Sequence, residues 1–138
     1  AVTAIWTTAR PKITLLLALA VLAACQSMQR AQPASSLEIV MTDDSCSPLN
    51  ARVEAGSTVT VKIENRSKVN QTLQLMVYPL TIEPDLTLAE NIYWQARVQP
   101  GFAVIEELPA PQMPGDYDFL CGEADAPDRS QGELTVVR

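Results

Sequence analysis

Short segments of alternating apolar and polar residues, separated by turns, are the feature that most limits how this chain can fold. The clearest is Thr58–Glu64, in which Val59, Val61 and Ile63 occupy every second position. Because successive side chains of a strand point to opposite faces, this segment predicts a strand with one buried face. After Cys25, no apolar pattern of helical period continues for three turns. The sequence therefore predicts an all-β protein.

Further strand candidates follow along the chain, each ending at residues that favour turns. They are Leu37–Met41, a brief strand from Val53, Leu73–Tyr78, Ile92–Trp94, Ala103–Ile105, Tyr117–Leu120 and Leu134–Val137. The section 79–90 is less regular, and we expect a single helical turn around Leu86 to Asn91. Several short strands with regular turns favour a Greek-key β-sandwich.

The first 25 residues have the layout of an export signal. Arg10 and Lys12 precede an apolar run that ends in Leu22-Ala23-Ala24-Cys25. The run is too short to span a bilayer, which takes about 20 apolar residues. A cysteine directly after Leu-Ala-Ala resembles the bacterial lipobox, and the resemblance implies cleavage before Cys25 and lipidation of its sulfur. An ordinary cleaved signal peptide is the alternative.

These features predict three parts: a lipoprotein signal peptide (1–24), a flexible tether (25–36) and a folded domain (37–138). The tether is polar, small and unpatterned. We expect a periplasm-facing lipoprotein of the cell envelope, and Gln26 after the lipidated cysteine favours the outer membrane of a Gram-negative cell. The expected partners are the membrane, through the lipid anchor, and an envelope protein or a metal ion.

Charge and residue types exclude several functions. All 16 acidic residues follow Cys25, and the formal net charge is -6. The sequence has no cluster of lysine and arginine, so nucleic-acid binding has no electrostatic basis. Histidine is absent, which removes Ser-His-Asp and Cys-His catalysis. Glu106 and Glu107 are strand neighbours that point to opposite faces, so they cannot act as a pair. We therefore expect no enzymatic activity.

Cys46 and Cys121 are the two cysteines that follow the predicted lipidation site. In an oxidising compartment, two cysteines far apart in sequence most often form a disulfide. Such a bond would close a loop of about 75 residues and stabilise the domain by roughly 4–5 kcal/mol, in the loop-entropy description. The alternative makes one or both thiolates metal ligands.

The order of several motifs resembles that of cupredoxins. In chain order they are Val53–Val59, Asn65-Arg66-Ser67, Pro100-Gly101-Phe102, Pro114–Gly122 and Gly132–Val136. With Cys46-Ser47-Pro48, the chain is similar to the cupredoxin-like domain of periplasmic iron-uptake proteins of the EfeO type, which have a Cys-x-Pro and a Pro-Gly-x-Tyr-x-x-x-Cys-Gly motif. The resemblance covers residues 37–137. It implies a cupredoxin-like β-sandwich in which Cys46 and Cys121 approach each other at one end.

The residues that bind metal in these relatives are missing. A type 1 copper site needs two imidazoles and a thiolate, and this chain has no histidine. The iron-uptake relatives carry carboxylates where this chain has Thr72-Leu73-Gln74 and Trp94-Gln95-Ala96-Arg97, and Arg97 would repel a cation. We therefore expect a disulfide-closed domain without a cofactor, which serves as a non-catalytic binding or accessory module.

The alternative function is metal binding in uptake or handling. Glu123, Asp125 and Asp128 follow Cys121 in one loop. If this loop meets the acidic loop before Cys46, carboxylates and the two thiolates could hold an iron or copper ion. The competing interpretation is that these acids are solvated loop residues.

Large side chains near the predicted strands are expected in the core. They are Met41, Met76, Tyr93, Trp94 and Phe102. The two methionines lie within apolar strands, and the aromatic residues flank the irregular section, so we interpret all five as packing residues and none as ligands or a binding platform.

Overall fold

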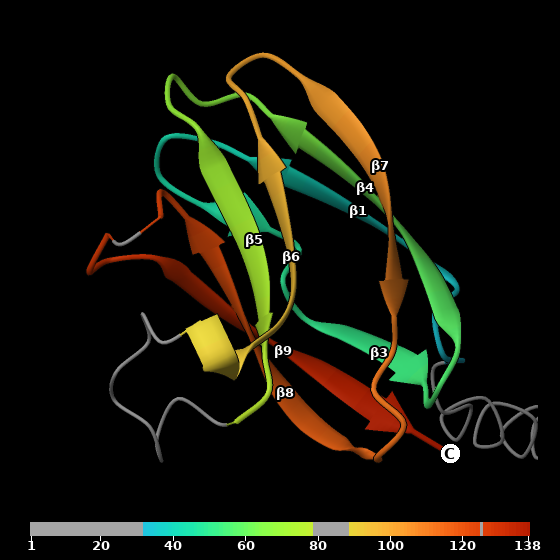
Figure 1. Ribbon diagram of the computed structural model, residues 1–138. Coiled ribbons are helices and arrows are strands. Elements are labelled where there is room, and N and C mark those ends of the chain that lie inside the picture. The colour runs from blue at the N-terminus through green and yellow to red at the C-terminus, as the bar shows by residue number, and fades with distance from the viewer. Residues whose placement is uncertain (1–31, 79–88, 125) are drawn as a thin grey trace, which may run out of the picture. The chain divides into compact units, whose positions relative to one another are not determined.

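The alternating segments of the sequence form two β-sheets that pack face to face (Figure 1). The computed structural model describes residues 32–78, 89–124 and 126–138. Its elements are β1 (Ser36–Met41), β2 (Cys46–Ser47), β3 (Ala51–Glu54), β4 (Thr58–Asn65), β5 (Gln71–Met76), the 3₁₀ turn η2 (Ala89–Asn91), β6 (Ile92–Val98), β7 (Ala103–Pro109), β8 (Gly115–Gly122) and β9 (Ser130–Val137). Among the described residues, no helix is both long and apolar enough to cross a bilayer.

The two sheets are built from segments that are distant in sequence. The four-stranded sheet has the order β2-β1-β4-β7, and the five-stranded sheet has the order β3-β9-β8-β5-β6. β1 pairs with β4 in parallel, as β3 does with β9, and the other pairs are antiparallel. The chain passes repeatedly from one sheet to the other, for example between β4 and β5 and between β6 and β7 (Figure 1). The predicted all-β sandwich is confirmed.

The core lies between the sheets. Val59, Val61 and Ile63 of β4 are fully buried, as their alternation predicts, and they belong to the same apolar cluster as Leu73 and Leu75 of β5. Burying one such side chain stabilises a fold by about 1.5–3 kcal/mol. A shift of β4 by one residue would turn all three of its apolar side chains to solvent, so this face fixes the register.

Several strands are longer than the apolar pattern predicts. β6 continues past Trp94 to Val98, and β7 continues past Ile105 to Pro109. β7 lies at the edge of its sheet and pairs with β4 along its whole length, although much of it is exposed. Because an edge strand buries little, backbone pairing rather than an apolar pattern sets its ends. The two-residue strand β2 shows no pattern and is not predicted. Of the expected helical turn, η2 is present, and residues 79–88 lie outside the described residues.

The large side chains divide between core and surface. Met41 and Met76 are fully buried, as predicted, whereas Tyr93 is 40% exposed and Phe102 is 61% exposed, so the core prediction is wrong for these two. Trp94 is partly buried against the core. Its Nε1 donates a hydrogen bond to the carbonyl of Glu107 at 3.0 Å, which ties the edge strand β6 of one sheet to the edge strand β7 of the other.

The chain enters the domain at the end of the sandwich opposite to the β1–β2 loop. The backbone N–H of Ala34 donates to the carbonyl of Arg52 in β3, and the carbonyl of Ser35 accepts from Thr60 in β4. These two hydrogen bonds fix the entering segment to both sheets. β1 then runs six residues, or about 20 Å, towards the loop that joins it to β2.

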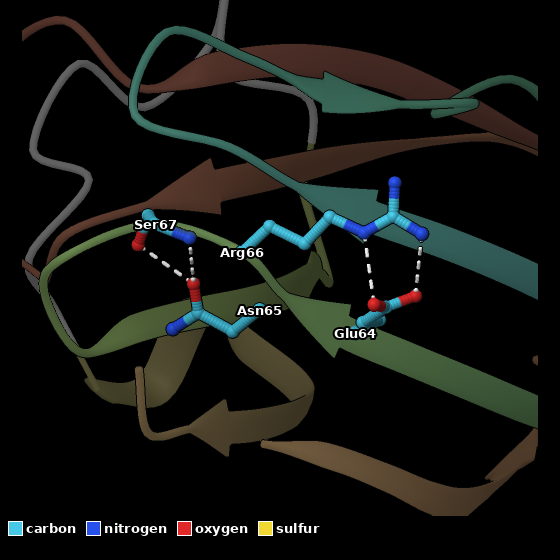
Figure 2. Close-up of polar contacts among 4 residues, drawn as sticks. All are labelled: Glu64, Asn65, Arg66 and Ser67. Atoms are coloured by element: carbon cyan, nitrogen blue, oxygen red, sulfur yellow. Dashed lines mark hydrogen bonds and ion pairs between the residues drawn. The ribbon is translucent and has the colours of Figure 1, made fainter. Parts of the chain in front are cut away.

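The side chain of Asn65, the last residue of β4, holds the following loop in place. Asn65 is fully buried. Its Nδ2 donates to the carbonyls of Val69 (2.9 Å) and Val98 (2.8 Å). Its Oδ1 accepts from the backbone N–H and the hydroxyl of Ser67 (Figure 2). One amide therefore joins the loop after β4 to the end of β6.

The backbone of Asn65 fixes a second loop. Its N–H donates to the carbonyl of Phe102, and its carbonyl accepts from the N–H of Gly101. Gly101 has a φ of 77°, a left-handed conformation that favours glycine at this turn between β6 and β7. Asn65 thus holds the loop between β4 and β5 and the turn between β6 and β7 at the same end of the sandwich.

An exposed ion pair lies beside this buried residue. The guanidinium of Arg66 donates to both carboxylate oxygens of Glu64, at 2.8 and 3.0 Å (Figure 2). The hydrogen bond from Arg66 lowers the pKa of Glu64, and the same bond raises the pKa of Arg66. Both side chains are exposed, and ion pairs of this kind contribute little to stability.

The buried amide of Asn65 and the exposed ion pair of Arg66 predict different losses of stability for substitutions at these adjacent residues. Asn65→Ala should lower the free energy of unfolding by about 3 kcal/mol, because it leaves buried carbonyls and an N–H without partners. Arg66→Gln, the matched control, removes the exposed ion pair and should leave the urea midpoint almost unchanged. Urea denaturation followed by circular dichroism measures both variants. An Asn65→Ala protein as stable as its parent would contradict the role given to this amide.

Candidate functional site

A disulfide joins the two sheets at one end of the sandwich. Cys46 lies in β2 of the four-stranded sheet, and Cys121 lies in β8 of the five-stranded sheet. Their sulfurs are bonded, with 6.2 Å between the Cα atoms and 75 residues between them in sequence. Cys121 is fully buried and Cys46 is 8% exposed. The predicted Cys46–Cys121 disulfide is confirmed.

Gln71 packs against this disulfide. Gln71 is the first residue of β5 and is buried. Its Nε2 donates to the carbonyl of Thr42 at 2.7 Å, and its Oε1 lies 3.6 Å from the sulfur of Cys46. A disulfide sulfur carries no proton, so the second contact is not a hydrogen bond while the disulfide stands. Within the described part of the chain, Oε1 of Gln71 then has no donor, and a reduced Cys46 thiol would supply one.

A polar hollow of about 310 Å³ opens beside the disulfide. We call it the disulfide hollow. It is lined by the loop before Cys46, which carries Asp43 and Asp44, and by the loop after Cys121. The two loops therefore meet, which is the condition set for the metal-binding alternative. One oxygen of Asp43 is used inside the protein, because it accepts the backbone N–H of Lys68 at 2.9 Å.

The ligand set of the metal alternative is not assembled in this structure. The sulfurs of Cys46 and Cys121 bond to each other, so neither is a free thiolate. Glu123 and Asp128 line the disulfide hollow as exposed side chains, and Asp125 lies outside the described residues. In the ranges that the structure describes, no group of three or more histidine, cysteine, aspartate or glutamate side chains is placed to hold a metal ion.

A second hollow of about 440 Å³ lies next to the first and shares Val69 and Glu123 with it. We call it the cationic hollow, because Lys68 and Arg97 both line it. Thr72 of β5 also lines it and is 4% exposed. The sequence predicts that Arg97 repels a cation, but it gives no sign that Thr72, Lys68 and Arg97 line one hollow.

The outer face of the five-stranded sheet carries a chain of side-chain hydrogen bonds below this hollow. Nη1 of Arg129 donates to Oε1 of Gln74, and Nε2 of Gln74 donates to Oε1 of Gln95. Gln74 is only 7% exposed. The oxygen and the nitrogen of the Gln74 amide are therefore both hydrogen-bonded to other side chains.

The disulfide predicts a large loss of stability on reduction. Closing a loop of this length stabilises a domain by about 4 kcal/mol, so reductant, or Cys121→Ser, should lower the melting temperature by roughly 15–25 °C. Differential scanning calorimetry with and without reductant measures the change. Cys25→Ser, which removes the cysteine outside the disulfide, is the control and should melt with the parent. Equal melting of reduced and oxidised protein would show that the bond adds no stability.

Comparison with known proteins identifies the fold. Reduced auracyanin from the photosynthetic bacterium Roseiflexus castenholzii is similar, with a TM-score of 0.64 and 19% identity over 78% of this chain and 100% of that chain. Auracyanin A of Chloroflexus aurantiacus, a "blue" copper protein, has a TM-score of 0.63 and 21% identity over 77% of this chain and 100% of its own. At such identities the likeness shows the fold alone. Among curated proteins, none matches this sequence. The family model of the cupredoxin-like domain matches residues 15–136, and the chain therefore belongs to the cupredoxin-like domain family.

Proposed function

We propose that this protein is an envelope lipoprotein whose cupredoxin-like domain is a non-catalytic binding or accessory module without redox copper. The observation that carries this proposal is the Cys46–Cys121 disulfide in a chain without histidine. A type 1 copper site uses a cysteine thiolate with two imidazoles. Here both cysteines of the domain are consumed by a cross-link, and the imidazoles do not exist in the sequence.

The proposed anchor is supported by the sequence around Cys25. Residues 1–31 lie outside the described residues, so the anchor rests on the resemblance of Leu22-Ala23-Ala24-Cys25 to a lipobox. The chain enters the domain at Ala34 and Ser35, and β1 leads from there to the disulfide end. A tether that joins the domain at this entry point meets the sandwich at the end opposite to the two hollows, and the membrane that we propose for the anchor is the outer membrane.

The competing function is iron or copper handling, as the EfeO-type resemblance implies. One observation favours it, since the acidic loops around the two cysteines do meet at the disulfide hollow. The two thiolates become donors only after the disulfide is reduced. Metal binding by the full ligand set therefore requires two free thiols in the protein as it is isolated.

Thiol counting and metal analysis separate these two functions. Alkylation of the purified, unreduced protein followed by mass measurement should leave Cys46 and Cys121 unmodified, and elemental analysis should find no stoichiometric iron or copper. Both results follow if the sulfurs are bonded to each other. Two alkylated domain thiols with bound metal would overturn the proposal and establish the competing function.

Lipid attachment predicts the location of the protein. The parent should sediment with membranes and enter the detergent phase, because acyl chains contribute about 0.8 kcal/mol of membrane affinity per buried CH₂. Cys25→Ser should be released in soluble form, since it removes the sulfur that would carry the lipid. Cell fractionation with immunoblotting measures both proteins. If Cys25→Ser stays in the membrane fraction as the parent does, the lipoprotein assignment fails.

A further inference from the structure

The cationic hollow concentrates positive charge in a chain that is acidic overall. Lys68 comes from the loop after β4 and Arg97 comes from β6, and both line the hollow. Three other basic side chains of the domain have partners: Lys62 pairs with Glu38, Arg66 pairs with Glu64, and Arg129 donates to Gln74. Lys68 and Arg97 form no side-chain hydrogen bond or ion pair with the described residues. With Lys68 and Arg97 against the single carboxylate of Glu123, the lining is net positive, which favours an anionic ligand.

Thr72 also lines this hollow, and its hydroxyl has no hydrogen-bond partner among the described residues. The residue as a whole is 4% exposed. It stands directly beside Arg97, because the two residues are paired across β5 and β6 and share a face of the sheet. The hydroxyl is reachable from solvent, so a bound acceptor would take the place of water as its partner.

We propose that the cationic hollow binds the oxyanion group, a carboxylate or a phosphate, of a small-molecule ligand. Arg97 supplies a planar set of N–H donors, Lys68 supplies an ammonium, and Thr72 donates its hydroxyl hydrogen. This inference rests on the proposed binding role of the domain and names the chemical class of its ligand.

The surrounding structure fixes the backbone around Lys68 and Arg97 before a ligand arrives. The N–H of Lys68 is bound by the carboxylate of Asp43. The two Nδ2 hydrogen bonds of Asn65 fix Val69 and Val98, the residues that follow Lys68 and Arg97 in the sequence. A site whose backbone is already fixed loses less entropy on binding.

Glu123 limits which anions bind well. Its carboxylate lines the same hollow and opposes negative charge there. A ligand that carries a hydrogen-bond donor next to its oxyanion would satisfy Glu123, whereas a simple anion would be repelled by it. Simple anions should therefore bind more weakly to the parent protein than to a variant in which the negative charge of Glu123 is removed.

Titration of the full-length protein in detergent with sodium phosphate, and separately with sodium malonate, at constant ionic strength tests the site. We expect saturable binding, with NMR shifts at the amides of Lys68, Thr72 and Arg97 and a Kd below about 10 mM. Saturation by phosphate alone identifies a phosphate ligand, and saturation by malonate alone identifies a carboxylate ligand. Saturation by neither anion overturns the proposal.

Variants distinguish this site from general charge attraction. Arg97→Gln should weaken binding roughly tenfold, the loss expected for one charged hydrogen bond. Thr72→Val keeps shape and charge and should weaken binding several-fold, whereas Glu123→Gln should strengthen phosphate binding roughly threefold. Lys62→Gln, on the other sheet, is the matched control and should bind as the parent does. Melting curves verify that each variant is folded.

Equal weakening by Lys62→Gln and Arg97→Gln would also overturn the proposal, because it would show non-specific attraction. Failure of the anion site leaves the metal-free accessory role standing, since that role depends on Cys46 and Cys121. Bound metal with free thiols would overturn that role, and anion binding by Lys68 and Arg97 would still be measured separately.

Discussion

The buried amide of Asn65 is the interaction on which the disulfide end of this domain depends. A loop that turns between two sheets buries backbone groups that strand pairing cannot satisfy, and such groups are costly when left alone. An amide side chain offers two donor hydrogens and an oxygen that accepts two hydrogen bonds. In Asn65 all of these are used, on Ser67, Val69 and Val98. This one residue therefore joins the loop that carries Lys68 to the end of the strand that carries Arg97.

The disulfide closes the same end by covalent means. A metal site would join the Cys46 loop and the Cys121 strand through shared ligands, which requires side chains held at fixed geometry around an ion. The Cys46–Cys121 bond joins the two sheets without an ion. The buried side chain of Gln71 packs beside the sulfur of Cys46 and donates one hydrogen bond to the carbonyl of Thr42. In this protein, loop closure and buried amides provide at the disulfide end the cross-linking that ligands would provide around a metal.

The sequence predicted those parts of the fold that show periodic burial. β4 was predicted because Val59, Val61 and Ile63 alternate, and the disulfide was predicted because two cysteines remain in an oxidising context. The ends of β6 and β7 were not predicted, since an edge strand is defined by backbone pairing. The cationic hollow was missed for a similar reason: Lys68 and Arg97 are 29 positions apart, and only the sheet order brings their segments together. Thr72 and Arg97 are neighbours only in the folded sheet, so the linear sequence gives no sign of this pair.

Net charge and local charge have different consequences for this domain. The chain as a whole carries -6, which on its own disfavours anions. At physiological ionic strength, however, exposed charges are screened beyond about 8 Å, so a ligand in a hollow responds mainly to the groups that line it. In the cationic hollow these are Lys68 and Arg97 against Glu123. Whether this hollow takes an anion is therefore decided by the balance of these three side chains and not by the net charge of the chain.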